Sequence, residues 1–234
     1  MRWQHRYMER FYRSRPGWLD GNQEFLALCD RVFSPGSRVL ETGPGSGSAI
    51  TAHLKARGIR VVGLDVDGAA AANPYLHEFR AYDGRKFPFE DASFDGALAD
   101  YVIEHLEDPS SVLREVARVL RPGAPFVFRT PNRYHYVALA SRVLPDRLSV
   151  WARRRDSGHR TYKKYFRCNT SLVCSRTLVQ AGLRVGEIRL IEKEPSYGFR
   201  SRLLFLPMLA YERIVNRFEC LRYFRANILG LAWK

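Results

Sequence analysis

The sequence predicts an α/β fold with a doubly wound, mostly parallel sheet, N-terminal helices and a basic insertion after the fifth strand. The apolar run 38–42 passes directly into a glycine turn at 43–47, as expected where a buried strand is followed by a helix. A second apolar run ends in Asp65, roughly 20 residues after the turn, which is the spacing of a βαβ unit. We expect five strands, near 38–42, 60–65, 78–82, 94–99 and 126–130, with helices between them.

The helices of the first half follow from apolar spacing and from breakers. The segment before residue 34 is expected to be helical, with four apolar side chains facing inward: Trp18, Phe25, Leu26 and Leu28. Between the first two strands, Ile50 and Leu54 lie four residues apart, and Gly58 would end that helix. Pro125 lacks the N–H that a central strand donates, so the fifth strand should begin after it, near Phe126.

The C-terminal part is less regular. Asn169 would cap a helix that ends at Gly182, and the alternation over 183–191 predicts a sixth strand. The seventh strand is hard to place, because 200–206 fits a strand and a helix equally well. The apolar stretch 203–211 is either a core helix or an amphipathic segment that rests on a membrane.

A chain of 234 residues can bury one substantial core, so we expect a single domain. Its segments would be a helical cap at 1–34, a cofactor-binding core at 35–132, a substrate-side insertion at 133–167, and a C-terminal helix, strand and apolar and basic stretch at 168–234. The sequence contains no apolar run long enough to span a membrane, and its four cysteines lack metal or disulfide spacing. We therefore expect a cytoplasmic location, with peripheral contact at the inner membrane surface left open.

The glycine turn indicates a nucleotide-type cofactor site, because a ligand can approach a backbone that carries no Cβ. Asp65 would then accept hydrogen bonds from ribose hydroxyls. The alternatives are a tight turn without a ligand and an aspartate that only caps a loop. The spacing is G-x-G-x-G rather than the G-x-G-x-x-G of dinucleotide sites, and Glu41 precedes it. A carboxylate would repel a pyrophosphate and attract a cationic amino group.

The motif from Glu41 to Gly47 resembles the first motif of class I S-adenosylmethionine-dependent methyltransferases. The resemblance continues in Asp65, in Tyr82-Asp83-Gly84, in 87–95 and in 99–109, and it ends with 113–123 and the following strand. It implies a Rossmann-like methyltransferase fold and S-adenosylmethionine as the cofactor. The implied cofactor-binding residues are Glu41, Gly43, Gly45, Gly47, Asp65, Val66, Asp83, Gly84, Ala99 and Asp100.

Within that family, Glu104-His105 and Thr130-Pro131-Asn132 are similar to the branch that contains ubiquinone-biosynthesis O-methyltransferases. His105 is the first candidate for the general base, because an imidazole titrates near working pH. The alternative is that His105 binds a backbone carbonyl and seats the next helix. Glu104 could orient the base, and His135 is a second candidate base. We predict no metal, because two adjacent ligands make a weak metal site.

The net charge of +14 lies entirely beyond residue 132, where 21 lysines and arginines face 7 acids. Two basic clusters carry it: Arg153, Arg154, Arg155, Arg160, Lys163, Lys164 and Arg167, then Arg200, Arg202, Arg213, Arg217, Arg222 and Arg225. Such a region suits an acidic or carrier-linked acceptor or an anionic membrane surface, and the alternative is a merely solvated face. Nucleic acid is disfavoured, because the fourth strand ends in Ala99-Asp100-Tyr101-Val102 instead of the motif that the resemblance associates with nucleobase methylation.

The sequence therefore predicts methyl transfer from S-adenosylmethionine, with O-methylation of a small or carrier-linked, acidic acceptor as the first hypothesis. The alternatives are a membrane-associated lipid or quinone-type acceptor, a non-catalytic binding protein that keeps the cofactor fold, and a nicotinamide oxidoreductase. The loop spacing and Glu41 disfavour the last of these. The sequence does not predict the oligomeric state.

Overall fold

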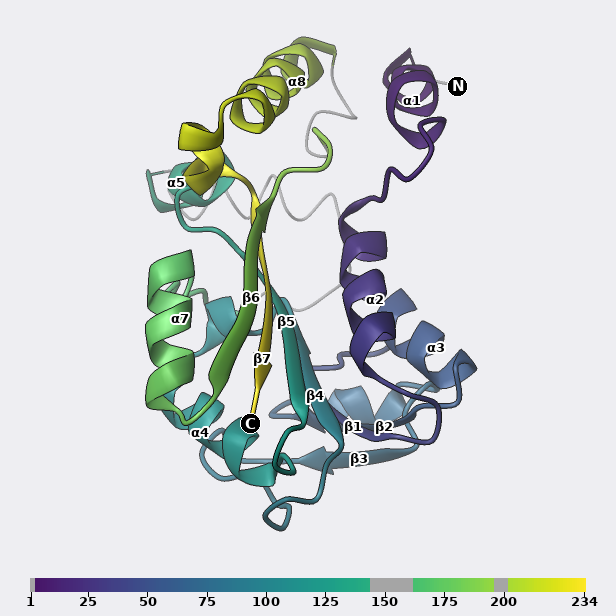
Figure 1. The fold of residues 1–234 in the computed structure, drawn as a ribbon, viewed down its shortest axis with the longest axis vertical. Helices are drawn as coiled ribbons and strands as arrows, with labels where there is room; N and C mark the ends of the chain where they lie inside the picture. Colours follow the sequence, from purple (N-terminus) through teal and green to yellow (C-terminus); the bar gives the residue numbers. More distant parts are fainter. Residues whose placement is uncertain (1–2, 144–161, 196–201) are drawn as a thin grey trace.

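A seven-stranded sheet in the order β3-β2-β1-β4-β5-β7-β6 organises the computed structural model, which describes residues 3–143, 162–195 and 202–234 (Figure 1). The strands are β1 (Arg38–Thr42), β2 (Arg60–Asp65), β3 (Glu78–Ala81), β4 (Gly96–Asp100), β5 (Pro125–Pro131), β6 (Arg184–Ile191) and β7 (Asn227–Trp233). The first five strands pair in parallel, and β7 lies antiparallel between β5 and β6. The strand order changes direction between β1 and β4, where doubly wound sheets bind their ligands.

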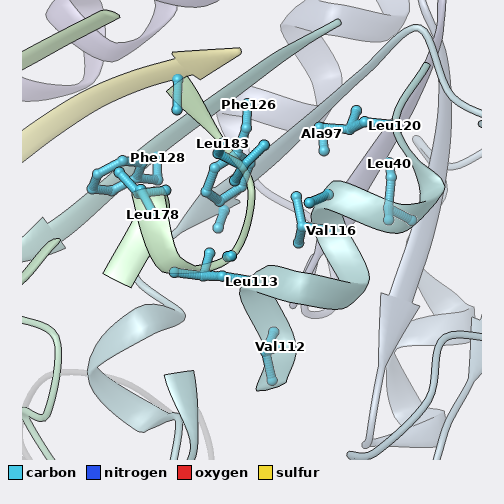
Figure 2. Close-up of a cluster of buried hydrophobic side chains, with 14 of the residues drawn as sticks. Leu40, Ala97, Val112, Leu113, Val116, Leu120, Phe126, Phe128, Leu178 and Leu183 are labelled. Carbon is cyan, nitrogen blue, oxygen red and sulfur yellow. The ribbon is translucent and has the colours of Figure 1, made fainter. Parts of the chain in front are cut away.

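Helices cover both faces of this sheet. Figure 1 shows α2 (Gly21–Val32) and α3 (Ala49–Ala56) on one face, and α4 (Pro109–Val119) and α7 (Ser171–Gln180) on the other. Strand residues alternate between these layers, as the pleat requires. Phe126 and Phe128 of β5 belong to the cluster of α4 and α7, where Figure 2 shows them with Leu178 and Leu183. Val127, which lies between the two phenylalanines, packs with α2 and α3 on the opposite face.

A third, smaller apolar cluster joins the two ends of the chain. Phe205 of α8 (Arg202–Arg217) packs with Met8 of α1 (Trp3–Met8) and with Tyr12 of the following π-helical turn, η1 (Glu9–Arg13). The Tyr12 hydroxyl also donates a 2.6 Å hydrogen bond to Glu212 Oε2. In Figure 1, α1 and α8 lie at the same end of the molecule, beyond the ends of β6 and β7. The predicted N-terminal cap is therefore built together with a C-terminal helix.

The remaining described elements are short and lie between the strands. They are α5 (Tyr136–Val143) and the 3-10 turns η2 (Gly68–Ala72), η3 (Ile103–His105) and η5 (Glu219–Phe224). The α3 helix begins with a Ser48 side chain that accepts from Thr51 N, and Gly58 follows its end at a φ of +76°. These capping groups confirm the expected helix between β1 and β2.

The structure decides one alternative that the sequence left open and corrects two expectations. The residues from 202 to 217 form α8, and the seventh strand is Asn227–Trp233. The N-cap of α7 is Thr170, whose hydroxyl accepts from Val173 N, because Asn169 donates instead to Thr130 Oγ1 and to the Pro131 carbonyl. Strand β5 begins at Pro125 itself, since the first residue of a strand tolerates a missing N–H.

Candidate active site

The glycine turn lies at the carboxyl edge of the sheet, between the ends of β2 and β4. The Gly43 N–H donates to the Leu64 carbonyl at 2.8 Å. A Cβ on Gly43 would lie 2.5 Å from Val102 Cγ2, and its φ of +64° also favours glycine. Gly45 and Gly47 have positive φ as well, but among the described residues no heavy atom beyond the chain neighbours of Gly45 lies within 4 Å of a Cβ built on it. The turn is thus tightly packed at Gly43 and open to a ligand at Gly45.

Glu41 is a buried carboxylate with one unused oxygen. Its Oε1 accepts a 3.1 Å hydrogen bond from the Thr51 hydroxyl. Its Oε2 is buried and has no hydrogen-bond partner in the part of the chain that the structure describes. Burial raises the pKa of Glu41 to about 8. A cationic group at this position would satisfy the free oxygen and stabilise the charged carboxylate, so the site fits a ligand with an amino group.

The loops after β2 and β3 form one corner of the rim. Asp65 Oδ1 accepts from Asp67 N at 2.9 Å, so one of its oxygens caps this loop. A Cβ on Gly84 would lie 3.7 Å from Val66 Cγ1, which places the two loops side by side. Asp83 accepts from Arg85 N, and this hydrogen bond lowers the pKa of Asp83. Four of the predicted cofactor residues, Asp65, Val66, Asp83 and Gly84, thus come together from two separate turns.

Asp100 lies at the end of β4, but its carboxylate is engaged by Arg129. Both Asp100 oxygens accept from the guanidinium, each at 2.7 Å. Arg129 is 3% exposed, donates also to the Gly21 carbonyl, and lies between the rings of Phe25 and Tyr101. Sequence reasoning missed Arg129, although a charged residue inside the apolar run 126–130 was an available signal. Ala99 is buried at the same strand end.

His105 offers one unprotonated nitrogen. Its Nδ1 lies 2.8 Å from the Lys163 carbonyl oxygen, which can only accept, so Nδ1 carries the proton. In the neutral ring Nε2 is therefore the basic nitrogen, and it lies 4.0 Å from Glu104 Oε1. Burial lowers the pKa of His105, which favours the neutral form. The two sequence hypotheses for His105 are thus compatible, since one nitrogen binds a carbonyl and the other is left to act as a base.

Glu104 is held by a short chain of hydrogen bonds from the end of β5. Asn169 Nδ2 donates to Thr130 Oγ1 at 2.7 Å, and the Thr130 hydroxyl donates to Glu104 Oε2 at 3.1 Å. Burial raises the pKa of Glu104 to about 7. The Thr130-Pro131-Asn132 motif therefore supports Glu104, and Asn169 is a further residue that sequence reasoning placed in another role.

The segment from Tyr162 to Arg167 lies along this rim. The Tyr162 hydroxyl donates to Asp67 Oδ2 at 2.8 Å, and Tyr165 N donates to the Glu104 carbonyl at 2.8 Å. The end of the predicted insertion thus contacts the loop after β2 and the turn after β4. Four arginines of the first basic cluster lie outside the described residues: Arg153, Arg154, Arg155 and Arg160.

His135 belongs to a different cluster. Its side chain is buried, with Nε2 3.4 Å from Glu192 Oε2, and its ring centroid lies 5.5 Å from that of Tyr211 on α8. A cavity of about 1710 Å³ borders this cluster and follows β6 from the segment after β5 to α8 and η5. Its charged lining comprises seven cationic and four acidic residues: Arg15, Arg189, Lys193, Arg213, Arg217, Arg222 and Arg225, with Glu24, Glu192, Glu212 and Glu219.

The sheet order, the glycine turn at 43–47 and the adjacent loops that carry Asp65 and Asp83 define a Rossmann-like cofactor-binding fold. The family model described as "Methyltransferase domain" matches residues 40–128. A "Ubiquinone biosynthesis O-methyltransferase" of Pseudomonas fluorescens is 30% identical over 191 residues, which cover 73% of this chain and 79% of the relative. An enzyme of the same description from Hahella chejuensis is 33% identical over 136 residues, and the match spans 50% of this chain and 57% of that relative.

Solved structures agree on the fold. An S-adenosylmethionine-dependent methyltransferase from Methanosarcina mazei has a TM-score of 0.59 at 18% identity and covers 88% of this chain and 96% of its own. Another, from Mesorhizobium loti, has a TM-score of 0.58 at 20% identity and covers 92% and 99%. The chain belongs to the family of S-adenosylmethionine-dependent methyltransferases. It is an enzyme with the Rossmann-like methyltransferase fold, and S-adenosylmethionine is its cofactor, so the nicotinamide and non-catalytic alternatives are not supported.

Proposed function

We propose that this protein methylates a hydroxyl group of a small or carrier-linked, acidic acceptor. The observation that carries the proposal is the His105 ring, whose Nδ1–H is held by the Lys163 carbonyl so that Nε2 is free of its proton. Bound S-adenosylmethionine supplies a methyl group that is already activated on a sulfonium. The chain's own residues then have two tasks, to align the acceptor oxygen and to remove its proton.

We assign the cofactor contacts as follows. Glu41 holds the amino group with its unpartnered oxygen, and the open backbone at Gly45 lies along the ligand. The remaining oxygen of Asp65 accepts from the ribose, while the corner of Val66, Asp83 and Gly84 borders the adenine. Ala99 is buried at the end of β4 and borders the cofactor there. Asp100 accepts hydrogen bonds from Arg129, and this pair stabilises the end of β4.

Replacing Asp65 tests the ribose assignment. We expect Asp65→Ala to weaken S-adenosylmethionine binding about tenfold or more, because the lost hydrogen bonds to hydroxyls are worth at least about 1.4 kcal/mol. Titration calorimetry measures the affinity, and thermal unfolding without ligand shows whether the variant remains folded. Asp91→Ala is the matched control, since Asp91 is an exposed aspartate that pairs with Arg118. An unchanged affinity in a folded Asp65→Ala variant would remove Asp65 from the site.

His105 serves as the general base in this proposal, with Glu104 and the Lys163 carbonyl as its positioning groups. We expect His105→Ala to reduce turnover about a hundredfold to ten-thousandfold while cofactor affinity stays the same. The control is His53→Ala, because His53 of α3 pairs with Asp30 of α2, away from the candidate base. Single-turnover assays with labelled cofactor and a panel of acidic phenols measure the turnover of both variants, and titration calorimetry measures their cofactor affinity. If His105→Ala methylated a phenol at the rate of the wild type, His105 would be excluded as the base.

Two observations support the acceptor class. The cavity along β6 has an excess of cationic side chains, the Lys163 carbonyl contacts His105, and the charge of Lys164 acts on the His105 ring. The positive charges of the cavity and of Lys164 suit an acceptor with a negative charge. The named relatives act in ubiquinone biosynthesis as O-methyltransferases, which favours a hydroxyl on an aromatic ring and keeps the quinone-type, membrane-associated acceptor as the second candidate. His135 is retained as the second candidate base for an acceptor that enters from the cavity side.

A further inference from the structure

Helix α8 is apolar on the face that it exposes as well as on the face that it buries. Phe205 and Val215 are buried against the rest of the protein. On the other side Leu203 is 85% exposed, Leu204 and Leu206 are each 54% exposed, and Ile214 is 49% exposed. A soluble surface helix normally turns charged and polar residues outward and its apolar stripe inward. The exposed face of α8 departs from that pattern.

Exposed apolar side chains continue from α8 into the next turn, η5. Phe218 follows α8 directly, and Tyr223 and Phe224 of η5 are each nearly half exposed. The Tyr211 hydroxyl donates to the Phe224 carbonyl at 2.6 Å, which ties the turn to the helix. We call this the α8–η5 surface, defined by seven apolar and three cationic residues: Leu203, Leu204, Leu206, Ile214, Phe218, Tyr223 and Phe224, with Arg213, Arg217 and Arg222.

Charge on this surface is mostly of one sign. Among the described side chains of α8, the only acid is Glu212, which is buried. In η5 Glu219 is exposed, but it is paired with Arg222 and Arg225 at 3.0 Å. The α8–η5 surface therefore combines exposed leucine and aromatic side chains with arginines, and this is the composition of helices that lie in the interface of an anionic bilayer.

The surface lies at the functional end of the molecule. Figure 1 shows α8 beyond the carboxyl end of β6 and the amino end of β7, and Asn216 Nδ2 donates to the Glu192 carbonyl directly after β6. A bilayer that contacts α8 would therefore lie near the sheet edge that carries the candidate active site. Among the described residues, no helix is long and apolar enough to cross a bilayer.

We propose that the α8–η5 surface docks this enzyme on membranes that contain anionic lipid. Charge complementarity selects this occupant over a second copy of the chain. A symmetric dimer through the same face would place Arg213 and Arg217 of one copy against the arginines of the other, which is unfavourable. Anionic headgroups instead pair with the arginines, while the leucines enter the headgroup and acyl boundary. The proposal concerns lipid binding and holds whatever acceptor the enzyme methylates.

The test is sedimentation of the full chain with vesicles of phosphatidylcholine, with and without phosphatidylglycerol. The variant Leu203→Gln/Leu206→Gln removes exposed apolar side chains without changing the net charge. Its matched control is Leu172→Gln/Val179→Gln on α7, where the two side chains are 58% and 62% exposed. A second pair compares Arg217→Gln/Arg222→Gln with Arg176→Gln/Arg184→Gln, which lose the same charge elsewhere on the surface. Cofactor affinity, measured for every variant, reports folding independently of lipid.

We expect the wild type to bind the phosphatidylglycerol vesicles and not those of phosphatidylcholine alone. Both α8–η5 variants should lose at least about tenfold in apparent affinity, and both controls should keep it, with cofactor affinity unchanged throughout. Equal losses in the control pairs would show nonspecific attraction and overturn the proposal. Absence of binding to either vesicle would overturn it as well, and so would a shift from dimer to monomer in Leu203→Gln/Leu206→Gln by analytical ultracentrifugation.

Discussion

Arg129→Ala should destabilise this protein by about 3–5 kcal/mol, because it leaves the Asp100 carboxylate without its partner at a largely buried strand end. The guanidinium also donates to the Gly21 carbonyl and to Asn22 Oδ1, so the start of α2 loses its tie to β5. A loss of this size is a large part of the total stability of an ordinary domain. Urea unfolding followed by circular dichroism measures it.

Two comparisons separate this cause from a general effect of losing an arginine. Arg121→Ala breaks the pair with Asp95 at a far more exposed position, where we expect a loss of at most about 1 kcal/mol. The double variant Arg129→Met/Asp100→Asn removes the buried charge together with its partner and should recover part of the loss. Equal stabilities of Arg129→Ala and Arg121→Ala would contradict the role assigned to the buried pair.

Among the first five strands, the edge strand β3 is half-buried or exposed, whereas β1, β2, β4 and β5 could be predicted because they are buried on both faces. Such strands are nearly continuous apolar runs, and glycine or polar turns separate them. The run 38–42 and its glycine turn show the pattern most clearly, and the structure places β1 inside the sheet, between β2 and β4. The strand boundaries were predicted less accurately. Phe94, the first residue of the expected fourth strand, makes only an isolated bridge with Leu120, and β4 begins at Gly96.

The seventh strand was missed because hydrophobicity alone does not distinguish burial from exposure. The strand candidate 200–206, for which a helix was an equal alternative, overlaps the start of α8, where Leu203, Leu204 and Leu206 are exposed. The true strand, β7, contains Gly230, where a Cβ would lie 2.1 Å from the Phe128 ring. A glycine inside an apolar run indicates such close approach, so this signal was present near the end of the chain.

Some residues of the candidate site could be predicted from their order along the sequence, whereas others depend on contacts between distant parts of the chain. Glu41, the glycines and Asp65 could be found because a strand, a turn and the next strand bring them to one edge in a fixed order. Their partners could not be found, since the Thr51 hydroxyl near Glu41 and the Lys163 carbonyl at His105 depend on tertiary packing. Lys163 lies 58 positions after His105, and no local pattern links the two residues.

We predict that S-adenosylmethionine binding releases a proton, because the proposed partner of its amino group is the buried carboxyl of Glu41. Burial raises the pKa of Glu41 to about 8, so in the free enzyme near pH 7 this carboxyl is mostly protonated. In the unfolded chain it ionises near its ordinary value of 4.5. The folded state thus binds more protons than the unfolded state between these values, and the stability of the free enzyme falls as the pH rises through this window, by up to about 1.4 kcal/mol per unit.

An amino group placed on Glu41 Oε2 reverses this preference, because the positive charge favours the carboxylate. We therefore expect binding near pH 7 to release close to one proton, which calorimetry in buffers of different ionisation enthalpy measures. Glu41→Gln should abolish the release and weaken binding roughly tenfold to a hundredfold, since a hydrogen bond to a charged group is worth about 1.5–3 kcal/mol. Glu104→Gln is the control, because Glu104 is also buried and has a raised pKa but lies beyond β4. Proton release that persists in Glu41→Gln and disappears in Glu104→Gln would move the amino group away from Glu41.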